Sequence, residues 1–282
     1  MTKKILIVGG GFLGKNISKI ISNIGLTPIV THVSNGQSNL DIRNIRMIEE
    51  SIERINPHTI INCAASTNID EIELNPETAF DVNSNGASNL ATIANRKNIK
   101  FLHISTDGIF SGIEGNYDEK DEPNPVNKYA QSKKLGEKLI QEQNKQTTII
   151  RTNFYGYDEY GNFLFNWVLN NLKQKKQFTA FSDVIFNPLE ISNLSEMIVE
   201  IMQTDFYGII HMAGNEIFSK YQFAQKIAQT LKYDSNLIIS GSVCDSDLIA
   251  QRPLNTTLSN TLAKSILKTK INSLEEWLQK NF

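Results

Sequence analysis

Three side chains in one stretch of this chain have the types and spacing of a proton-transfer device. Thr106 follows a short apolar run, and Tyr129 and Lys133 stand together farther along, four residues apart. Side chains four apart share one face of a helix. An ammonium close to a phenol favours the phenolate and lowers the pKa of the tyrosine from about 10. We therefore expect Tyr129 to exchange a proton with a substrate oxygen that Thr106 holds.

The position of the Tyr129 and Lys133 pair carries more weight than its spacing, because such a pair also arises by chance in a chain with eight tyrosines. Thr106 and Asp107 stand at the end of a predicted strand, and Tyr129 opens the helix after the next loop. An open α/β sheet binds its ligands at the carboxyl ends of its strands. We interpret the set as catalytic, with a chance pair as the alternative.

A glycine turn precedes this stretch by about ninety residues of chain and is the second chemical element. Gly9-x-Gly11-x-x-Gly14 lies between the apolar run 4–8 and a helical pattern that continues to Gly25. Turns of this type let backbone amides approach a pyrophosphate at the start of a helix. We predict a dinucleotide site; a tight turn without a ligand is the alternative.

The end of the second predicted strand bears on which dinucleotide binds. An NAD site usually has an acidic residue there, whereas residues 31–35 read Thr-His-Val-Ser-Asn. No carboxylate would repel a 2′-phosphate, but no arginine marks a phosphate pocket either. The pattern slightly favours NADP(H) and leaves NAD(H) open.

Apolar runs and helical patterns alternate along the first half of the chain. We predict strands over residues 4–8, 28–33, 58–64, 100–105 and 147–152. A helix is predicted to open at Asn75-Pro76-Glu77, with Asn75 as its cap. Strands that alternate with helices indicate a doubly wound parallel sheet, the α/β Rossmann class. We assign residues 1–155 to a dinucleotide-binding core and 156–282 to a smaller substrate-binding lobe that is interleaved with the core.

The later pattern is less regular. It contains capping boxes at Ser219 with Gln222 and at Ser273 with Glu276, and short strand-like pieces over 208–212 and 237–240.

Composition and net charge limit the classes of molecule that the protein is expected to bind. Of the 282 residues 40% are apolar and 21% are charged, and the formal net charge is -2, which provides no basic field for nucleic acid or an anionic membrane. No apolar run is long enough to span a bilayer. Two cysteines and four histidines show no disulfide or metal-ligand spacing, so we expect no metal and a reducing cytoplasm. A homodimer is an interpretation that the sequence leaves open.

Several strings together resemble an extended short-chain dehydrogenase/reductase. They are the glycine turn, Ile61 to Thr67, Asp81-Val82-Asn83, Ile104 to Asp107 with Phe110 and Gly112, and Tyr129-x-x-x-Lys133 with Gly136-Glu137. Within that superfamily, Ser-Thr-Asp-x-x-Phe-x-Gly is most similar to the dTDP-4-dehydrorhamnose reductases and related nucleotide-sugar reductases. The similarity covers most of the chain and is most specific between residues 58 and 140.

The resemblance implies reduction of a keto group on a nucleotide-linked deoxysugar with NADPH or NADH, for polysaccharide precursors of the cell surface. It implies that Thr106, Tyr129 and Lys133 are catalytic, with Asn83 supporting the lysine through a water. The implied cofactor-binding residues are Gly9, Gly11, Phe12, Leu13, Gly14, Asp41, Ile42, Ala64, Ala65, Ser66, Tyr129 and Lys133. The implied substrate-binding residues are Thr106, Asp107, Asn153 and Arg252. The planar guanidinium of Arg252 would suit the diphosphate; a surface ion pair is its alternative.

Two departures from the family pattern bear on the substrate. Rhamnose-pathway reductases usually carry a tryptophan after the fifth strand, whereas this chain has Asn153-Phe154-Tyr155-Gly156, which resembles sugar-nucleotide epimerases and dehydratases. Gly108 stands where many reductases place tyrosine, which implies a roomier pocket. An epimerase or dehydratase with retained NAD therefore stays an alternative. So does a non-catalytic regulatory subunit like the methionine adenosyltransferase beta protein, which resembles these reductases.

Overall fold

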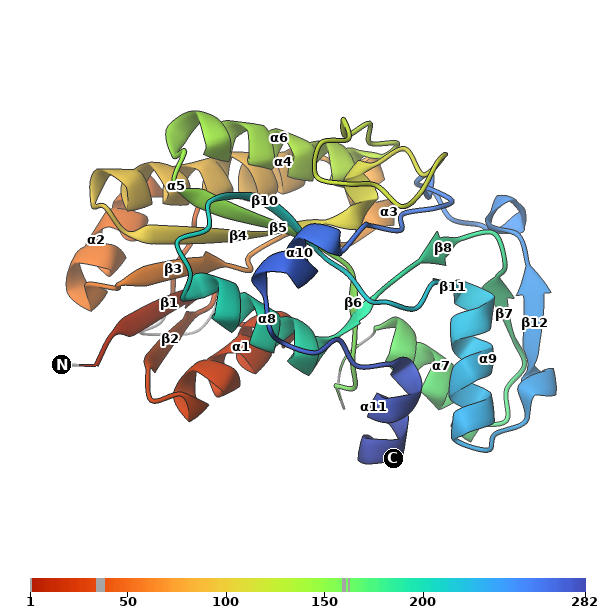
Figure 1. Cartoon of the computed structure of the whole chain (residues 1–282). Helices are drawn as coiled ribbons and strands as arrows, with labels where there is room; N and C mark the ends of the chain where they lie inside the picture. Colours follow the sequence, from red (N-terminus) through yellow and green to blue (C-terminus); the bar gives the residue numbers. More distant parts are fainter. Residues whose placement is uncertain (1, 34–38, 159–160, 162) are drawn as a thin grey trace.

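A parallel sheet forms the centre of the protein. The computed structural model describes residues 2–33, 39–158, 161 and 163–282, and within them six parallel strands pair in the order β10-β5-β4-β3-β1-β2 (Figure 1). The bounds are β1 (Lys4–Val8), β2 (Thr27–Thr31), β3 (Thr59–Asn62), β4 (Lys100–Thr106), β5 (Thr147–Thr152) and β10 (Gly208–Met212). The chain runs outward from β1 to one edge and then to the other, so the predicted doubly wound Rossmann class is confirmed.

Helices cover both faces of this sheet because its strands are apolar on both sides. Ile5 and Ile7 of β1 pack with α1 (Phe12–Asn23) and α8 (Ile191–Met202). Leu6 and Val8 point the other way, toward α2 (Ile45–Ile55), α5 (Ala87–Arg96) and α6 (Lys128–Gln143). This alternation is the period of two that a pleated strand imposes.

The structure around Asn75 differs from the prediction that a helix opens there. Asn75 ends α3 (Ile69–Leu74), since its amide donates to the carbonyl of Glu71, 2.9 Å away. The next helix, α4 (Glu77–Phe80), has Pro76 at its amino end and no side-chain cap, so Asn75 as a cap was a wrong prediction. A π-helical segment, η2 (Asp81–Gly86), joins α4 directly to α5. π-helical turns are rare in proteins, and those that occur often lie at functional sites.

The second half of the chain builds a further apolar core beside the sheet. It contains α7 (Leu164–Lys173), α9 (Lys220–Thr230) and α11 (Leu274–Asn281), with β7 (Phe178–Phe181) paired to β12 (Ile238–Gly241) (Figure 1). The predicted capping boxes of Ser219 and Ser273 are confirmed. The other short elements are η3 (Asp107–Ile109), β6 (Phe154–Tyr155), β8 (Ile185–Phe186), β9 (Leu189–Glu190), β11 (Phe218–Ser219), η4 (Ser235–Leu237), η5 (Val243–Asp245) and α10 (Thr261–Ile266).

The two halves of the chain share the central layers. After residue 155 the chain supplies α8, which packs with α1 in one core, and β10, which pairs with β5. The division into 1–155 and 156–282 stays a prediction.

Candidate active site

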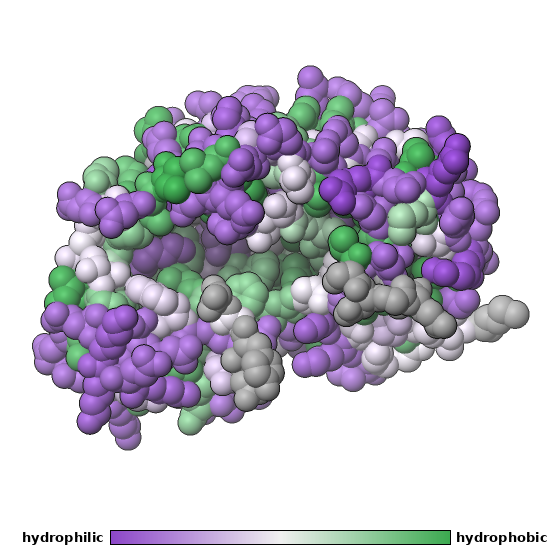
Figure 2. Space-filling model, turned by 180° about the vertical axis from the view of Figure 1, so that it is seen from behind, coloured by the Kyte–Doolittle hydropathy of each residue, from purple (hydrophilic) through white to green (hydrophobic). Residues whose placement is uncertain are grey.

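The predicted site residues gather at the carboxyl ends of the strands. The molecule is hollowed on the side turned away in Figure 1, and the floor of the hollow is apolar between polar walls (Figure 2). A cavity of about 200 Å³ lies at the ends of β1, β2 and β3, lined by Gly9, Thr31, Asp41, Ile42 and Ala64 among others. A larger cavity, about 610 Å³, lies at the opposite edge beside Lys100 and Asn144 and contains none of the predicted residues.

The glycine turn has the geometry of an anion cradle. Gly9 has a φ of 97°, and a Cβ there would lie 2.6 Å from the amide nitrogen of Ala64. A Cβ at Gly14 would lie 2.1 Å from the carbonyl oxygen of Gly9, so both positions require glycine. Gly11 caps α1 without a side chain, and a Cβ there would meet nothing within 4 Å. The unpaired amides of the first helical turn are thus open to a phosphate group.

An arginine that sequence reasoning missed stands beside Asp41 at the end of β2. Arg43 lines the 200 Å³ cavity and pairs with Asp41, NH2 to Oδ2 at 2.6 Å. Hydrogen bonding to Arg43 lowers the pKa of Asp41. The sequence carries no sign of an arginine here, because Arg43 lies in the loop between β2 and α2 and only the fold brings it to the wall of the cavity. Ser34 and Asn35, which entered the cofactor argument, lie outside the described residues.

Asp107 joins two of the other predicted substrate-side residues, Thr106 and Asn153, to Thr256. Its carboxylate accepts from Thr106 Oγ1 at 3.1 Å, from Asn153 Nδ2 at 2.9 Å and from Thr256 Oγ1 at 2.6 Å. Burial raises the pKa of Asp107, and these hydrogen bonds oppose that rise. The strand end therefore presents hydroxyl and amide groups around one buried carboxyl group.

Tyr129 and Lys133 lie on the first turns of α6, but no hydrogen bond joins them in the described part of the chain. Lys133 Nζ lies 2.7 Å from the carbonyl oxygen of Ile104 and 3.3 Å from Nε2 of His103. Burial raises the pKa of Tyr129 to about 12, with Thr106 opposing through a hydrogen bond and Asp107 adding to it. The predicted lowering of this pKa is wrong here, because the phenol is enclosed and the lysine faces β4.

Burial also shifts the pKa of Lys133. It lowers this pKa to about 8, while the negative charge of Glu137 and the thiol of Cys63 oppose the shift. Glu137 is itself held by Arg151 in a buried ion pair of 2.8 Å and accepts from Ser105. The lysine thus lies above a charged pair that connects α6 to β4 and β5.

Asn83 joins the loop after β3 to α6. Its Oδ1 accepts from the amide of Ser66 at 2.8 Å, and its Nδ2 donates to the carbonyl of Ser66 and to Ser132 Oγ, at 3.0 Å and 2.9 Å. The π turn of η2 places this side chain. Asn83 therefore positions the loop with Ala64, Ala65 and Ser66 against α6, and makes no direct contact with Lys133.

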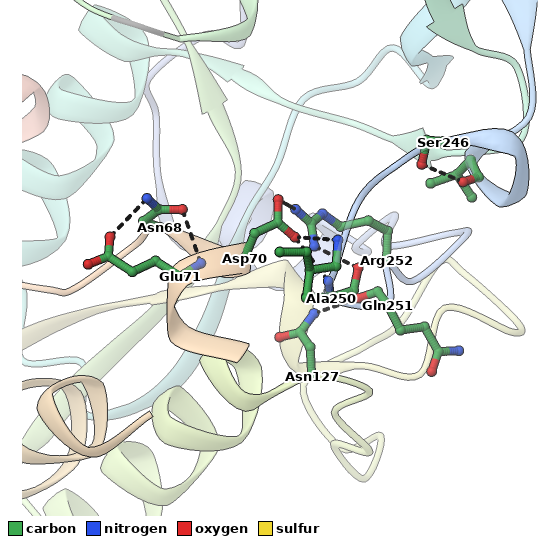
Figure 3. A network of polar contacts seen from close by, with 10 residues as sticks. Asn68, Asp70, Glu71, Asn127, Ser246, Ala250, Gln251 and Arg252 are labelled. Carbon is green, nitrogen blue, oxygen red and sulfur yellow. Dashed lines mark hydrogen bonds and ion pairs between the residues drawn. The ribbon is translucent and has the colours of Figure 1, made fainter. Parts of the chain in front are cut away.

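Arg252 lies apart from the Asp107 group in this structure. Its NH2 donates to Asp70 Oδ2 at 3.0 Å and its NH1 to the carbonyl of Ala250 at 2.8 Å (Figure 3). The second oxygen of Asp70 accepts from the amides of Ile249 and Ala250. Arg252 therefore makes an ion pair, which was the alternative to its predicted role. Asp70 on α3 also holds the backbone of the segment just before Arg252.

A second residue that the sequence reasoning missed is Lys220, the first residue of α9. Its Nζ lies 3.1 Å from the centre of the Phe186 ring, and no hydrogen bond of Nζ is found among the described residues. Burial lowers the pKa of Lys220 to about 8, opposed by the charge of Asp107. Only the fold brings the start of α9 within the electrostatic reach of Asp107, so no local signal in the sequence could have placed this lysine there.

Comparisons with known proteins agree with the geometry. The family model described as RmlD substrate binding domain matches residues 3–282. A dTDP-4-dehydrorhamnose reductase of Aggregatibacter actinomycetemcomitans is 32% identical over 271 residues, which cover 92% of this chain and 91% of that protein. The crystal structure of a dTDP-4-dehydrorhamnose reductase from Bacillus anthracis in complex with NADP has a TM-score of 0.92 at 29% identity, covering 99% of this chain and 98% of that one.

The similar proteins also include one of the regulatory kind that the sequence left open as an alternative. The methionine adenosyltransferase 2 subunit beta of Bos taurus is 26% identical over 272 residues, which cover 91% of this chain and 80% of that protein. Helices in the described ranges are all too short or too polar to cross a bilayer.

Proposed function

This chain belongs to the RmlD substrate binding domain family, and on that premise we propose that it is an NADPH-dependent reductase of a keto group on a nucleotide-linked deoxysugar. Its product would serve as a precursor of cell-surface polysaccharide. The observation that carries the proposal is the meeting of Thr106, Asp107 and Tyr129 at the strand ends, beside the glycine turn.

Tyr129 is proposed as the proton donor. A phenol whose pKa is raised to about 12 stays protonated at neutral pH, which suits an acid in the reducing direction. When NADPH is bound, it supplies a hydride to the carbonyl carbon. The C=O double bond becomes a C–O single bond, and the oxygen takes its proton from Tyr129. Thr106 would donate a hydrogen bond to that oxygen by rotating its hydroxyl away from Asp107, and the ammonium form of Lys133 would stabilise the phenolate that remains.

The cofactor is proposed to lie along the groove from Asp41 to Tyr129. Gly9, Gly11, Phe12, Leu13 and Gly14 would bind the pyrophosphate, and Asp41 and Ile42 would flank the adenine. Ala64, Ala65 and Ser66 would line the path to the nicotinamide, with Asn83 holding that loop. NADP(H) is favoured over NAD(H), since Arg43 stands at the adenine end.

The nucleotide sugar is proposed to meet Thr106, Asp107 and Asn153 at the sugar end and Arg252 at the diphosphate. Lys220 is added to this set because its ammonium lies in the field of Asp107. We further propose that residues 156–282 form the substrate-binding lobe. The protein is also proposed to be a homodimer and to act in the cytoplasm.

The test is turnover by the purified chain. NADPH or NADH oxidation is followed with a panel of dTDP-, UDP- and GDP-linked 4-keto sugars, and we expect reduction of at least one with NADPH preferred. Tyr129→Phe should lower kcat by about a hundredfold or more. Tyr207→Phe, an exposed tyrosine, should leave kcat unchanged. Full activity in Tyr129→Phe would contradict the assigned acid.

Two other outcomes point elsewhere. Interconversion of sugars without net oxidation of added cofactor would indicate an epimerase or dehydratase with retained NAD. The similarity to the beta subunit favours a second candidate, a non-catalytic regulatory subunit. That candidate is supported if no sugar of the panel turns over while NADPH still binds.

A further inference from the structure

His103 is a buried histidine that has no part in the roles above, although it touches the predicted catalytic lysine. It lies within β4, and its side chain is 0% exposed. Its Nε2 is 3.3 Å from Lys133 Nζ, and its Nδ1 is 3.1 Å from Nδ2 of Asn62. The ring thus connects the end of β3 to the lysine on α6.

The proton on this ring can be assigned from Asn62. The amide of Ala64 donates to Asn62 Oδ1 at 3.1 Å, which fixes the orientation of the asparagine. Its NH2 group therefore faces His103, and an NH2 group can only donate. Nδ1 of His103 must accept this hydrogen bond and so carries no proton.

The remaining proton faces Lys133. Burial in the apolar interior lowers the pKa of His103 well below its usual range, so the ring is neutral with a single proton. That proton must lie on Nε2. An ammonium has no lone pair, and only an uncharged amine of Lys133 can accept from Nε2–H while donating to the carbonyl of Ile104.

We propose that His103 is a positioning residue that holds Lys133 as an uncharged amine against β4 and loses its hold when the lysine takes up a proton. The proposal rests on the reductase function, in which the charged lysine acts on the phenolate of Tyr129. Among the described residues, the other ionisable groups that act on the charge of Lys133 are Cys63 after β3 and Glu137 on α6, whereas Tyr129 on the same helix makes no hydrogen bond with it. Cys63 and Glu137 favour the ammonium, so His103 opposes both.

The consequence is an alkaline limit on turnover. If the ammonium is the active form, kcat falls as the pH rises through the pKa of Lys133, which is about 8. His103→Gln places an amide oxygen where Nε2–H stood, and this oxygen can accept from the ammonium. We expect the pH at which kcat is halved on the alkaline side to rise by about one unit.

Asn62→Asp tests the same contact with the histidine in place. The carboxylate keeps an acceptor for Ala64 and draws the ring proton to Nδ1, which leaves Nε2 as an acceptor for the ammonium. The alkaline midpoint should again rise. His58→Gln, a histidine at the opposite edge of the sheet, should keep the wild-type midpoint.

A measurement that needs no turnover is the tautomer of His103 in the ligand-free protein, read from nitrogen-15 NMR couplings and assigned by the signal that His103→Gln lacks. The proposal expects the proton on Nε2; a proton on Nδ1 overturns it. Unchanged alkaline midpoints in both site variants also overturn it, since His103 would then only fill the core. Failure of the wild type to reduce any sugar counts against the reductase function, and the tautomer still decides the contact.

Discussion

The hydrogen bonds around Asp107 leave a nearby charged group, Lys220, for a ligand. Its carboxylate is already matched by three neutral donors, from Thr106, Asn153 and Thr256. Lys220 is therefore not needed to satisfy Asp107, and its ammonium rests on the ring of Phe186. Burying an ammonium without hydrogen-bond acceptors costs free energy, and none is found for Lys220 among the described residues, so under the proposed function we expect its free donors to bind the sugar nucleotide.

Replacing Lys220 by methionine should weaken binding of the sugar nucleotide and leave hydride transfer intact. Loss of a hydrogen bond from a charged donor costs about 1.5–3 kcal/mol, so KM should rise about tenfold or more. The control is Lys226→Met on the same helix, whose lysine pairs with Glu275 and lies partly exposed. Steady-state kinetics on the best sugar of the panel measures both. An unchanged KM would show that Lys220 has no contact with the substrate.

Arg43 provides a second prediction about a single residue. Its guanidinium lines the 200 Å³ cavity and is 45% exposed, so under the proposed function it could reach a 2′-phosphate by leaving Asp41. Arg43→Ala should raise KM for NADPH about tenfold while KM for NADH changes little. Arg46→Ala is the matched control, on the first turn of α2 beyond the cavity lining. Equal changes for the two cofactors would place the 2′-phosphate elsewhere.

Among the elements, strands were easier to predict than helix ends. Thr147–Thr152 agrees residue for residue with its prediction, because all of its residues except Arg151 are β-branched, as is typical of a buried parallel strand. Asn75-Pro76-Glu77 carries a strong start signal, but α3 already occupies the preceding turn and Asn75 closes it. The π turn of η2 has no periodic signature, since it depends on how η2 meets α6 and not on local spacing.

That meeting of η2 and α6 explains why Gly136 is glycine. A Cβ at Gly136 would lie 2.2 Å from the carbonyl oxygen of Asn83, a backbone atom that cannot rotate away. Gly136→Ala should separate the two helices and lower the free energy of unfolding by about 1–3 kcal/mol, although alanine favours an isolated helix by about 1 kcal/mol.

Urea denaturation measures this loss, with Lys138→Ala on the exposed face of α6 as the control. Because Asn83 holds the loop of Ser66, kcat should fall in Gly136→Ala as well. A more stable Gly136→Ala protein would mean that η2 and α6 pack less closely than described.

Over the whole molecule, the segment before α10 runs back across the first half of the chain. Thr256 reaches Asp107, Thr257 accepts from the amide of Tyr117, and Asn127 donates to the carbonyl of Gln251. None of these contacts has a sequence signature, because each joins residues more than a hundred positions apart. This is why the strings predicted to be catalytic could be recognised in the sequence, whereas the place of Lys220 and the partner of Arg252, Asp70, needed the fold.

The role of Arg252 can be decided by comparing both members of that ion pair. Asp70→Asn keeps an oxygen for the amides of Ile249 and Ala250 and removes only the charge that holds the guanidinium. If Arg252 binds the diphosphate, Arg252→Gln should raise KM for the sugar nucleotide about tenfold, whereas Asp70→Asn frees the guanidinium and should leave KM equal or lower. If Arg252 only fastens the segment, both variants should change KM alike. Both variants should lose about 1 kcal/mol or less of unfolding free energy, because the ion pair is partly exposed. With equal stability, a difference in KM between Arg252→Gln and Asp70→Asn measures the contact of Arg252 with the substrate.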